Sequence, residues 1–206
     1  LERDRRPPMK TTGSEEAARI ATRLRARAGD DRVFVFTSGG PGEATGTAAS
    51  EVAIAFARLD AGPVLLVDAA LDEPACHARF DAPRSPGLAE ILRGQAAPEQ
   101  AIYSAGVERL AIVPAGGAVE DRLALLSGAA LPAMFAHARG RFAWVIANAP
   151  DFPRSATSTL VATLADGVVL VVAAGAHSRT EVHDMQRDLR GLRARLVGTI
   201  LSGTGR

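Results

Sequence analysis

A glycine-rich turn between a predicted strand and a predicted helix is the part of this sequence best suited to chemistry. The turn runs from Thr37 to Ser50 (TSGGPGEATGTAAS), after the apolar run Val33–Phe36 and into the helix-forming stretch Ala48–Leu59. In a strand–turn–helix setting, the backbone N–H groups of such a loop can cradle phosphate groups. The segment therefore predicts a phosphate-binding loop.

The side chains that give such a loop its catalytic chemistry are missing from the turn. A working loop ends in Gly-Lys-Ser/Thr, with the lysine on the β- and γ-phosphates and the hydroxyl on Mg²⁺. Here the corresponding residues are Ala44, Thr45 and Gly46. The one lysine of the chain is Lys10, and the other 23 of the 24 Lys and Arg residues are arginines. The backbone pattern of the loop thus predicts a nucleotide-binding site, but its side chains lack the groups that would bind the phosphates and Mg²⁺.

Two further polar residues follow predicted strands. Asp68 comes directly after the apolar run Val64–Val67, and Asn148 comes directly after Trp144–Ala147. In open parallel sheets, ligands bind beyond the carboxyl ends of the strands. We therefore expect Asp68 and Asn148 at the same edge of the sheet as the glycine-rich turn, with Asp68 either in residual contact with a nucleotide or in a structural, helix-capping role.

The composition predicts an ordinary globular protein. Hydrophobic residues make up 47% of the 206 residues and charged residues 23%, which is typical of a single domain with a buried core. A net charge of +1 gives no reason to expect a nucleic-acid partner. The sequence shows no signal peptide and no apolar run of about 20 residues, the length that spans a bilayer. With a lone Cys76, a reducing, cytoplasmic location is predicted.

The order of elements predicts an α/β fold. Residues 1–13 are expected to be a flexible N-terminal segment, and residues 14–206 a single domain that begins with a helix over Glu15–Ala28. Another helix is predicted over Glu181–Leu196 from its apolar spacing. The predicted strands are short continuous apolar runs, as expected where helices cover both faces of a sheet: Val33–Phe36, Val64–Val67, Leu110–Val113, Trp144–Ala147, Val168–Ala173 and Val197–Leu201. This alternation indicates a doubly wound, mostly parallel sheet.

Taken together, the segments resemble the cytoplasmic domain of bacterial tyrosine kinases (BY-kinases), within the MinD/ParA-like branch of P-loop ATPases. The resemblance covers roughly Glu15 to Ser202. The stretches that carry it are Thr37–Glu43, VLLVDAAL (Val64–Leu71) with Pro74, His77 and Phe80, GLAEILRG (Gly87–Gly94), VPAG (Val113–Gly116), LALLS (Leu123–Ser127), WVIANAP (Trp144–Pro150), DGVVLVV (Asp166–Val172) and VGTILS (Val197–Ser202). It implies a P-loop NTPase-like fold and a role in capsule or exopolysaccharide export.

This chain departs from the family at each motif that performs chemistry. Besides the altered loop, the second aspartate expected after Asp68 is Ala70, and the Walker B aspartate is Asn148. We therefore expect no catalytic residue, no metal ligand and no cofactor. The residues interpreted as a residual, degenerate nucleotide site are Gly39, Gly40, Gly42, Thr45, Gly46, Thr47, Asp68 and Asn148.

Features linked to assembly are retained in part. The family's E-x-x-R oligomerisation motif is present as Glu16 and Arg19, which implies a homo-oligomer. The family's C-terminal tyrosine cluster is absent, and the single tyrosine, Tyr103, is expected to be packed rather than phosphorylated. Arg19 shares one predicted helix face with Arg23 and Arg27, a face that is either solvated or a contact for a subunit or an anionic membrane.

These observations lead to one main hypothesis and two alternatives. The main hypothesis is a pseudokinase or pseudo-ATPase that acts as a scaffold or regulator in exopolysaccharide or capsule biosynthesis. Its implied partner is a membrane polysaccharide co-polymerase, which would hold it at the inner membrane. The alternatives are an active tyrosine kinase that binds ATP and Mg²⁺ through non-standard ligands, and a MinD/ParA-like positioning protein.

Overall fold

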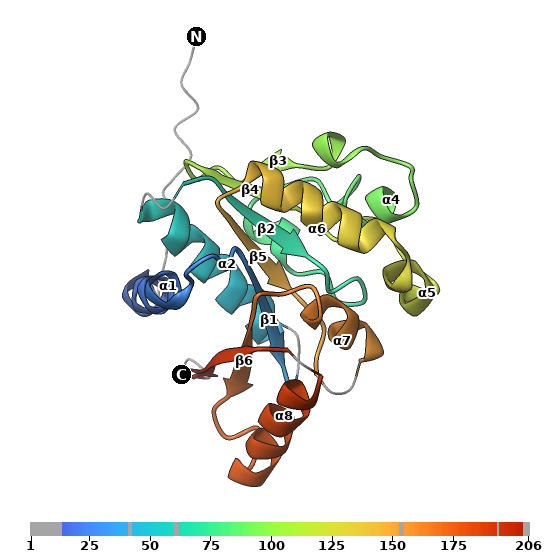
Figure 1. The fold of residues 1–206 in the computed structure, drawn as a ribbon. Helices are drawn as coiled ribbons and strands as arrows, with labels where there is room; N and C mark the ends of the chain where they lie inside the picture. Colours follow the sequence, from blue (N-terminus) through green and yellow to red (C-terminus); the bar gives the residue numbers. More distant parts are fainter. Residues whose placement is uncertain (1–13, 41–42, 60–61, 153–154, 193, 204–206) are drawn as a thin grey trace.

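The fold is a twisted sheet between two layers of helices (Figure 1). The computed structural model describes residues 14–40, 43–59, 62–152, 155–192 and 194–203, so the predicted flexible segment 1–13 lies outside it. Within these residues the sheet has seven strands in the order β3-β4-β2-β5-β1-β6-β7, parallel except for the pair β3–β4. The strands are β1 (Val33–Ser38), β2 (Val64–Asp68), β3 (Tyr103–Ser104), β4 (Leu110–Val113), β5 (Trp144–Asn148), β6 (Gly167–Ala173) and β7 (Leu196–Ser202). The predicted doubly wound sheet is confirmed.

The helices cover both faces of the sheet. One face carries α1 (Ser14–Arg27), α2 (Glu43–Arg58) and α3 (Cys76–Arg79). The other carries α4 (Leu88–Leu92), α5 (Arg122–Ser127), α6 (Ala130–Arg141), α7 (Ala156–Ala162) and α8 (Arg179–Gly191), with a short 3₁₀ helix at Pro98–Gln100. No helix among the described residues is long and apolar enough to cross a bilayer.

Alternate residues of each buried strand enter different cores. In β1, Phe34 and Phe36 pack towards α1 and α2, while Val33 and Val35 pack towards α6 and α7. All six residues of β1 are buried. Continuous apolar runs are therefore needed here, because helices exclude water from both sides of the sheet.

Trp144 anchors the core beneath α2, as expected. Its ring centroid lies 4.8 Å from that of Phe56 on α2 and 6.0 Å from that of Phe34 on β1. The guanidinium carbon of Arg32 lies 5.4 Å from the centroid of the Trp144 ring. These contacts tie α2, the helix that follows the glycine-rich turn, to the centre of the sheet.

The structure corrects the predicted helix Glu181–Leu196. Helix α8 ends at Gly191, and Leu196 is instead the first residue of β7, where it pairs with Val168 of β6. Leu196 still packs beside Leu189 in the same apolar cluster. The helical spacing of Leu196 was misleading, because a strand that packs against the same apolar cluster can also bring a leucine next to Leu189.

Candidate functional site

The predicted strand ends do meet at one edge of the sheet. Strand β5 lies between β1 and β2, and in its register Asn148 is opposite both Phe36 of β1 and Asp68 of β2. The glycine-rich turn leaves β1 after Ser38, and α2 begins already at Glu43, five residues before the predicted helix start at Ala48, so Glu43–Ser50 of the predicted turn is helical. The parallel topology therefore brings the turn, Asp68 and Asn148 together, as the sequence predicted.

Asp68 is fully occupied by protein donors. Its carboxylate accepts hydrogen bonds from the backbone N–H groups of Ala70 (3.3 Å), Ala75 (3.1 Å) and Cys76 (3.0 Å), and from Asn148 Nδ2 (2.9 Å). Its exposed fraction is 0%. Two of the donors lie at the start of α3, so Asp68 caps that helix. This geometry matches the structural, helix-capping role, one of the two roles predicted for Asp68.

The environment of Asp68 sets its titration. Burial raises the pKa of the carboxyl above its usual value of 3.8, because the charged form loses its hydration. The hydrogen bonds from Cys76, Asn148, Ala70 and Ala75 act in the opposite direction and offset part of this rise. Asp68 is thus a desolvated carboxylate whose charge is held by four donors of the fold.

Gly46 faces the place where the loop would need a Mg²⁺-binding hydroxyl. A Cβ atom added at Gly46 would lie 3.1 Å from Ala75 Cβ and 3.5 Å from Asn148 Nδ2. A serine there would press on Ala75, which would have to give way by a few tenths of an ångström and whose N–H is bound to Asp68. The space next to Gly46 is therefore narrowed by Ala75, at the start of α3, and by Asn148, at the end of β5.

The threonines beside Gly46 differ in environment. Thr45, which stands where a lysine would reach the phosphates, is completely buried, and its Oγ1 has no hydrogen-bond partner among the described residues. Thr47 is exposed. A buried threonine has neither the charge nor the reach of a lysine side chain.

The first half of the turn packs against α8 and its N-terminal loop. Met185 leaves no room for a Cβ atom at Gly39, and His177 Nε2 lies 3.1 Å from the position of a Cβ at Gly40. Gly42 lies outside the described residues. Neither His177 nor Met185 was predicted to lie at this site. The available signal was their place in the segment that follows β6, a strand neighbouring β1: His177 in the loop before α8, and Met185 within α8.

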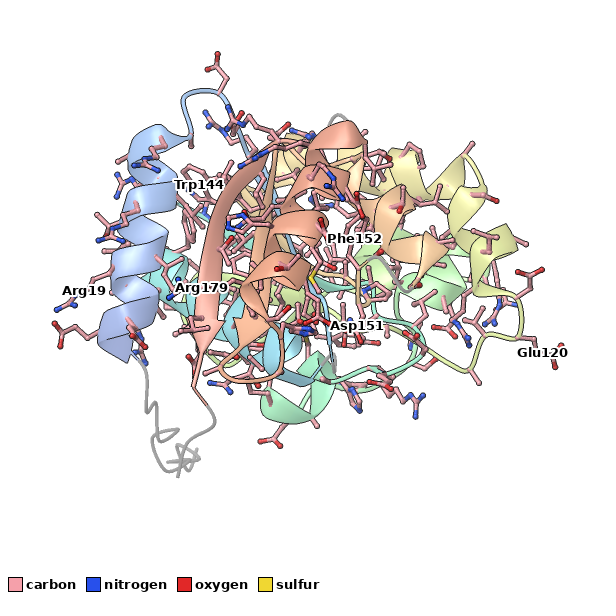
Figure 2. The ribbon with its side chains drawn as sticks, turned by 90° about the horizontal axis from the view of Figure 1, so that it is seen from below. Arg19, Glu120, Trp144, Asp151, Phe152 and Arg179 are labelled. Carbon is pink, nitrogen blue, oxygen red and sulfur yellow. The ribbon has the colours of Figure 1, made fainter. Side chains whose placement is uncertain are left out.

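Ser38 and Asp151 form hydrogen bonds at the start of the turn. Ser38 Oγ lies 2.8 Å from the Gly40 carbonyl oxygen and 2.9 Å from Asp151 Oδ1, so its one proton is shared between two acceptors. Phe152 N–H donates to the Ser38 carbonyl at 2.5 Å. Asp151 and Phe152 lie next to each other at the centre of the molecule in Figure 2. The segment after β5 thus holds the start of the turn in place.

Comparison with known proteins identifies the family. No family model matches the chain. It is 27% identical to the tyrosine-protein kinase YwqD of Bacillus subtilis, over 94% of this chain and 82% of YwqD. The crystal structure of the VpsO kinase domain superposes with a TM-score of 0.83 at 30% identity, covering 93% of this chain and 96% of that domain. The chain belongs to the BY-kinase family. It is also 30% identical to the succinoglycan biosynthesis transport protein ExoP of Rhizobium meliloti, but spans only 24% of that protein.

Measured against the requirements of a BY-kinase site, these residues do not fit Mg²⁺. The hydroxyl position is Gly46, Asp68 already accepts four hydrogen bonds, and Asn148 turns its amide nitrogen towards Asp68. Mg²⁺ binds oxygen ligands in octahedral geometry, usually with carboxylates that are free to reach it. Within the described part of the chain, no group of three or more His, Cys, Asp or Glu residues could hold a metal ion.

The two residues predicted to serve oligomerisation, Glu16 and Arg19, lie on the surface of α1. Arg19 is exposed and Glu16 precedes it by one turn, and Arg19 Nη2 forms an ion pair with Glu15 Oε1 at 2.7 Å. Tyr103 is packed, as expected: its ring is half-buried, and its hydroxyl donates to the Pro86 carbonyl at 3.1 Å. In Figure 2, Arg19 lies at one edge of the domain, away from Asp151 near its centre.

Proposed function

We propose that this chain is a catalytically degenerate member of the BY-kinase family, acting as a scaffold or regulator rather than a kinase. The observation that carries the proposal is the state of Asp68. Its carboxylate, on the last residue of β2, is buried and bound by four protein donors. A carboxylate in that position stabilises the fold and cannot also organise a metal ion without losing those contacts.

The changes around Asp68 act in the same direction. Phosphoryl transfer depends on positive charge and a metal ion at the phosphates, and a single element of this kind contributes about 10³–10⁵ in rate. In this chain Thr45 stands in place of the lysine, Gly46 in place of the residue with the hydroxyl, and Asn148 in place of the acid. All three missing groups would stabilise the same transition state, so the effects of losing them add up. We therefore expect turnover far below that of an intact BY-kinase.

The pathway proposed for the chain is the synthesis and export of an exopolysaccharide or capsule. The similarity to ExoP, a succinoglycan biosynthesis transport protein, supports this assignment. The chain spans 24% of ExoP. We propose a membrane polysaccharide co-polymerase as its partner, with the chain held on the cytoplasmic side of the inner membrane through it.

Calorimetric titration with MgATP and MgADP is the decisive test. We expect no saturable heat with either nucleotide, since neither a lysine nor a free carboxylate faces the phosphate position. The VpsO kinase domain, titrated under the same conditions, controls for the quality of the nucleotide and the metal.

Micromolar binding accompanied by ATP turnover would contradict the proposal and favour an active kinase with non-standard ligands. Incubation with MgATP followed by mass spectrometry provides an independent readout. Phosphate on serine, threonine or Tyr103 would support the kinase, whereas an unmodified chain supports the scaffold.

Self-assembly through α1 is a second part of the proposal. We expect light scattering to detect a species larger than the monomer, and Arg19→Ala to shift it towards the monomer. Glu15→Ala is the matched control: it removes the exposed Arg19–Glu15 ion pair, worth about 0–1 kcal/mol, but keeps Glu16 and Arg19. A wild-type monomer at every concentration, or equal effects of both variants, would count against the motif.

A further inference from the structure

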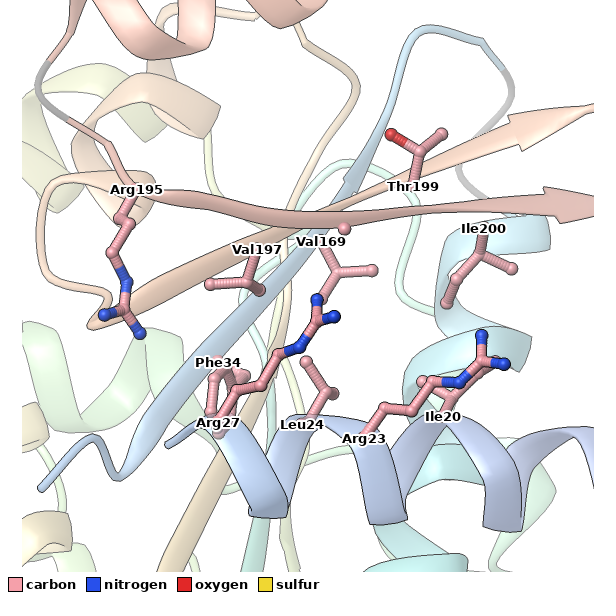
Figure 3. A pocket seen from close by; sticks show the side chains of 11 residues that line it. Ile20, Arg23, Leu24, Arg27, Phe34, Val169, Arg195, Val197, Thr199 and Ile200 are labelled. Atoms are coloured by element: carbon pink, nitrogen blue, oxygen red, sulfur yellow. The ribbon is translucent and has the colours of Figure 1, made fainter. Parts of the chain in front are cut away.

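A pocket of about 150 Å³ lies between α1 and the edge strand β7. Figure 3 shows side chains from α1 and from the sheet converging on it. The apolar lining consists of two residues of α1 and four of the sheet: Ile20, Leu24, Phe34, Val169, Val197 and Ile200. Because Leu24, Phe34 and Val169 belong to the buried core, the packing of the domain fixes the floor of the pocket.

The rim of the pocket is positively charged. Arg23 and Arg27 extend from α1 towards β7 (Figure 3), and both are exposed. Among the described residues, no hydrogen bond or ion pair occupies either guanidinium group, whereas Arg195, just before β7, is paired with Asp31. Like charges four residues apart on a helix repel each other, and an anion bound between them removes the repulsion. The rim is therefore suited to an anionic group.

The size of the pocket selects the apolar part of its ligand. A dry cavity of about 150 Å³, lined by leucine, isoleucine and phenylalanine, accommodates one benzene ring. Pockets that enclose a drug-sized molecule are larger, at roughly 300–1,000 Å³. The α1–β7 pocket therefore fits a single aromatic ring, and the rest of the ligand stays outside it.

The charge of the rim selects the polar part of the ligand. Guanidinium groups form paired hydrogen bonds with carboxylates and phosphates. A phosphate monoester carries a charge of about −1.5 to −2 at pH 7, which balances two arginines, whereas one carboxylate balances only one of them. A phosphate bonded to an aromatic ring therefore satisfies the apolar pocket and both guanidinium groups.

Among the side chains of proteins, phosphotyrosine is the one that joins a six-membered aromatic ring to a phosphate. We propose that the α1–β7 pocket binds a phosphotyrosine side chain of another protein. The ring fills the apolar pocket, and the phosphate lies between Arg23 and Arg27. The ligand belongs to another protein because the single tyrosine of this chain, Tyr103, is half-buried and donates its hydroxyl proton to the Pro86 carbonyl.

The edge strand β7 can hold the segment that presents the phosphotyrosine. Within the described residues, β7 is the last strand of the sheet and pairs with β6 alone. Its outer edge offers backbone N–H and C=O groups to an extended segment. Because side chains alternate along a strand, every second side chain of that segment points to the α1 side of the sheet. No residue of the strand-end site lines the pocket, so phosphotyrosine binding does not depend on the proposed loss of catalysis.

An NMR titration of the wild-type chain with a short peptide tests the proposal. The probe is Ala-Gly-phosphotyrosine-Gly-Ala with blocked termini, and the control is the same peptide without phosphate. We expect saturable binding of the phosphopeptide, with ring-current shifts of the methyl groups of Val169, Val197 and Ile200. The backbone amide signals of β7 should shift in the same titration. The unphosphorylated peptide should leave all of these signals unchanged.

Arg23→Ala and Arg27→Ala test the phosphate half of the site. Because each removes charge-assisted hydrogen bonds, we expect each to weaken binding of the phosphopeptide at least about tenfold. Arg25→Ala is the matched control, since Arg25 is exposed on the same helix but does not line the pocket. Thermal unfolding monitored by circular dichroism verifies that every variant is folded.

Ile200→Phe tests the apolar half of the site. Ile200 lines the pocket and is half-buried, so a phenylalanine there occupies part of the space for the ligand's ring. We expect the phosphopeptide to bind this variant more weakly than the wild type. Inorganic phosphate, which needs only the arginines, should shift the side-chain signals of Arg23 and Arg27 equally in both proteins.

Three results would overturn the proposal. The first is a phosphopeptide that does not bind, or that binds equally to the wild type and to both arginine variants. The second is free phenyl phosphate that binds as tightly as the phosphopeptide, because the ligand would then be a small aryl phosphate rather than a protein segment. The third is arginine-dependent binding to vesicles of phosphatidylcholine and phosphatidylglycerol without binding of the phosphopeptide, which would assign the arginines to an anionic membrane.

Discussion

Replacing Asp68 with alanine is expected to lower the free energy of unfolding by about 3 kcal/mol. The change removes the acceptor for the backbone N–H groups of Ala75 and Cys76 and for the amide of Asn148. Buried donors without acceptors carry a desolvation cost of about 1–3 kcal/mol each, partly relieved where water enters. Chemical denaturation followed by the fluorescence of the single tryptophan measures the loss.

Asp68→Asn separates the charge of this residue from its shape. Because burial raises the pKa of Asp68 above 3.8 in the folded state, the folded protein keeps the proton to higher pH than the unfolded chain. Stability therefore falls as the pH rises from about 3.8 through the folded pKa, and it levels off above that. The asparagine amide cannot titrate in this range, so the variant should lose this slope.

The useful quantity is the difference in unfolding free energy between wild type and Asp68→Asn at each pH. Glu90 and Asp166, whose pKa values are lowered in the folded state, contribute the opposite slope. Their contributions cancel in the difference. A difference that does not change with pH would show that Asp68 is not desolvated as described.

A loss of unfolding free energy for Asp68→Ala below about 1 kcal/mol would argue against the capping role of Asp68.

The second large effect is expected for Phe56→Ala, at about 3–5 kcal/mol of unfolding free energy. Phe56 is completely buried on α2, and its ring centroid lies near those of Phe34 (6.4 Å) and Trp144 (4.8 Å). Alanine leaves a cavity among rigid strand residues that cannot move in to fill it. The same helix carries Thr45 and Gly46, so its anchor also positions the strand-end site.

Phe56→Leu is the matched control for Phe56→Ala. Leucine keeps most of the apolar volume, so we expect a loss of less than about 2 kcal/mol. Urea titrations of the three proteins give the comparison, with a common slope as the check that unfolding stays two-state. Equal stability of the alanine variant and the wild type would mean that α2 does not pack on Trp144 as described.

The strands were predictable because burial on both faces leaves a strong local signal. Val64–Val67 and Leu110–Val113 are continuous apolar runs, and both are strands in the structure. The site was partly predictable for the same reason, since the parallel order requires Asp68 and Asn148 to share an edge with the turn. The two-residue strand β3 was missed because so short a segment has no periodicity.

Other features depend on contacts between distant parts of the chain. Leu196 fits a helical spacing, and only its pairing with Val168 assigns it to β7. His177 and Met185 are far from Gly39 and Gly40 in sequence, yet they lie against the glycine-rich turn. No local pattern encodes such an encounter, because it is decided by the order of strands in the sheet.

By itself, the sequence determined the fold class, the position of the glycine-rich turn and the absence of a lysine from it. These properties depend on residue types and local periodicity. The tertiary structure alone decided that Asp68 caps α3, that Ala75 and Asn148 narrow the space beside Gly46, and that an arginine-rimmed pocket opens between α1 and β7. Each of these outcomes depends on atoms from separate elements meeting within a few ångströms, which is set by packing rather than by local sequence.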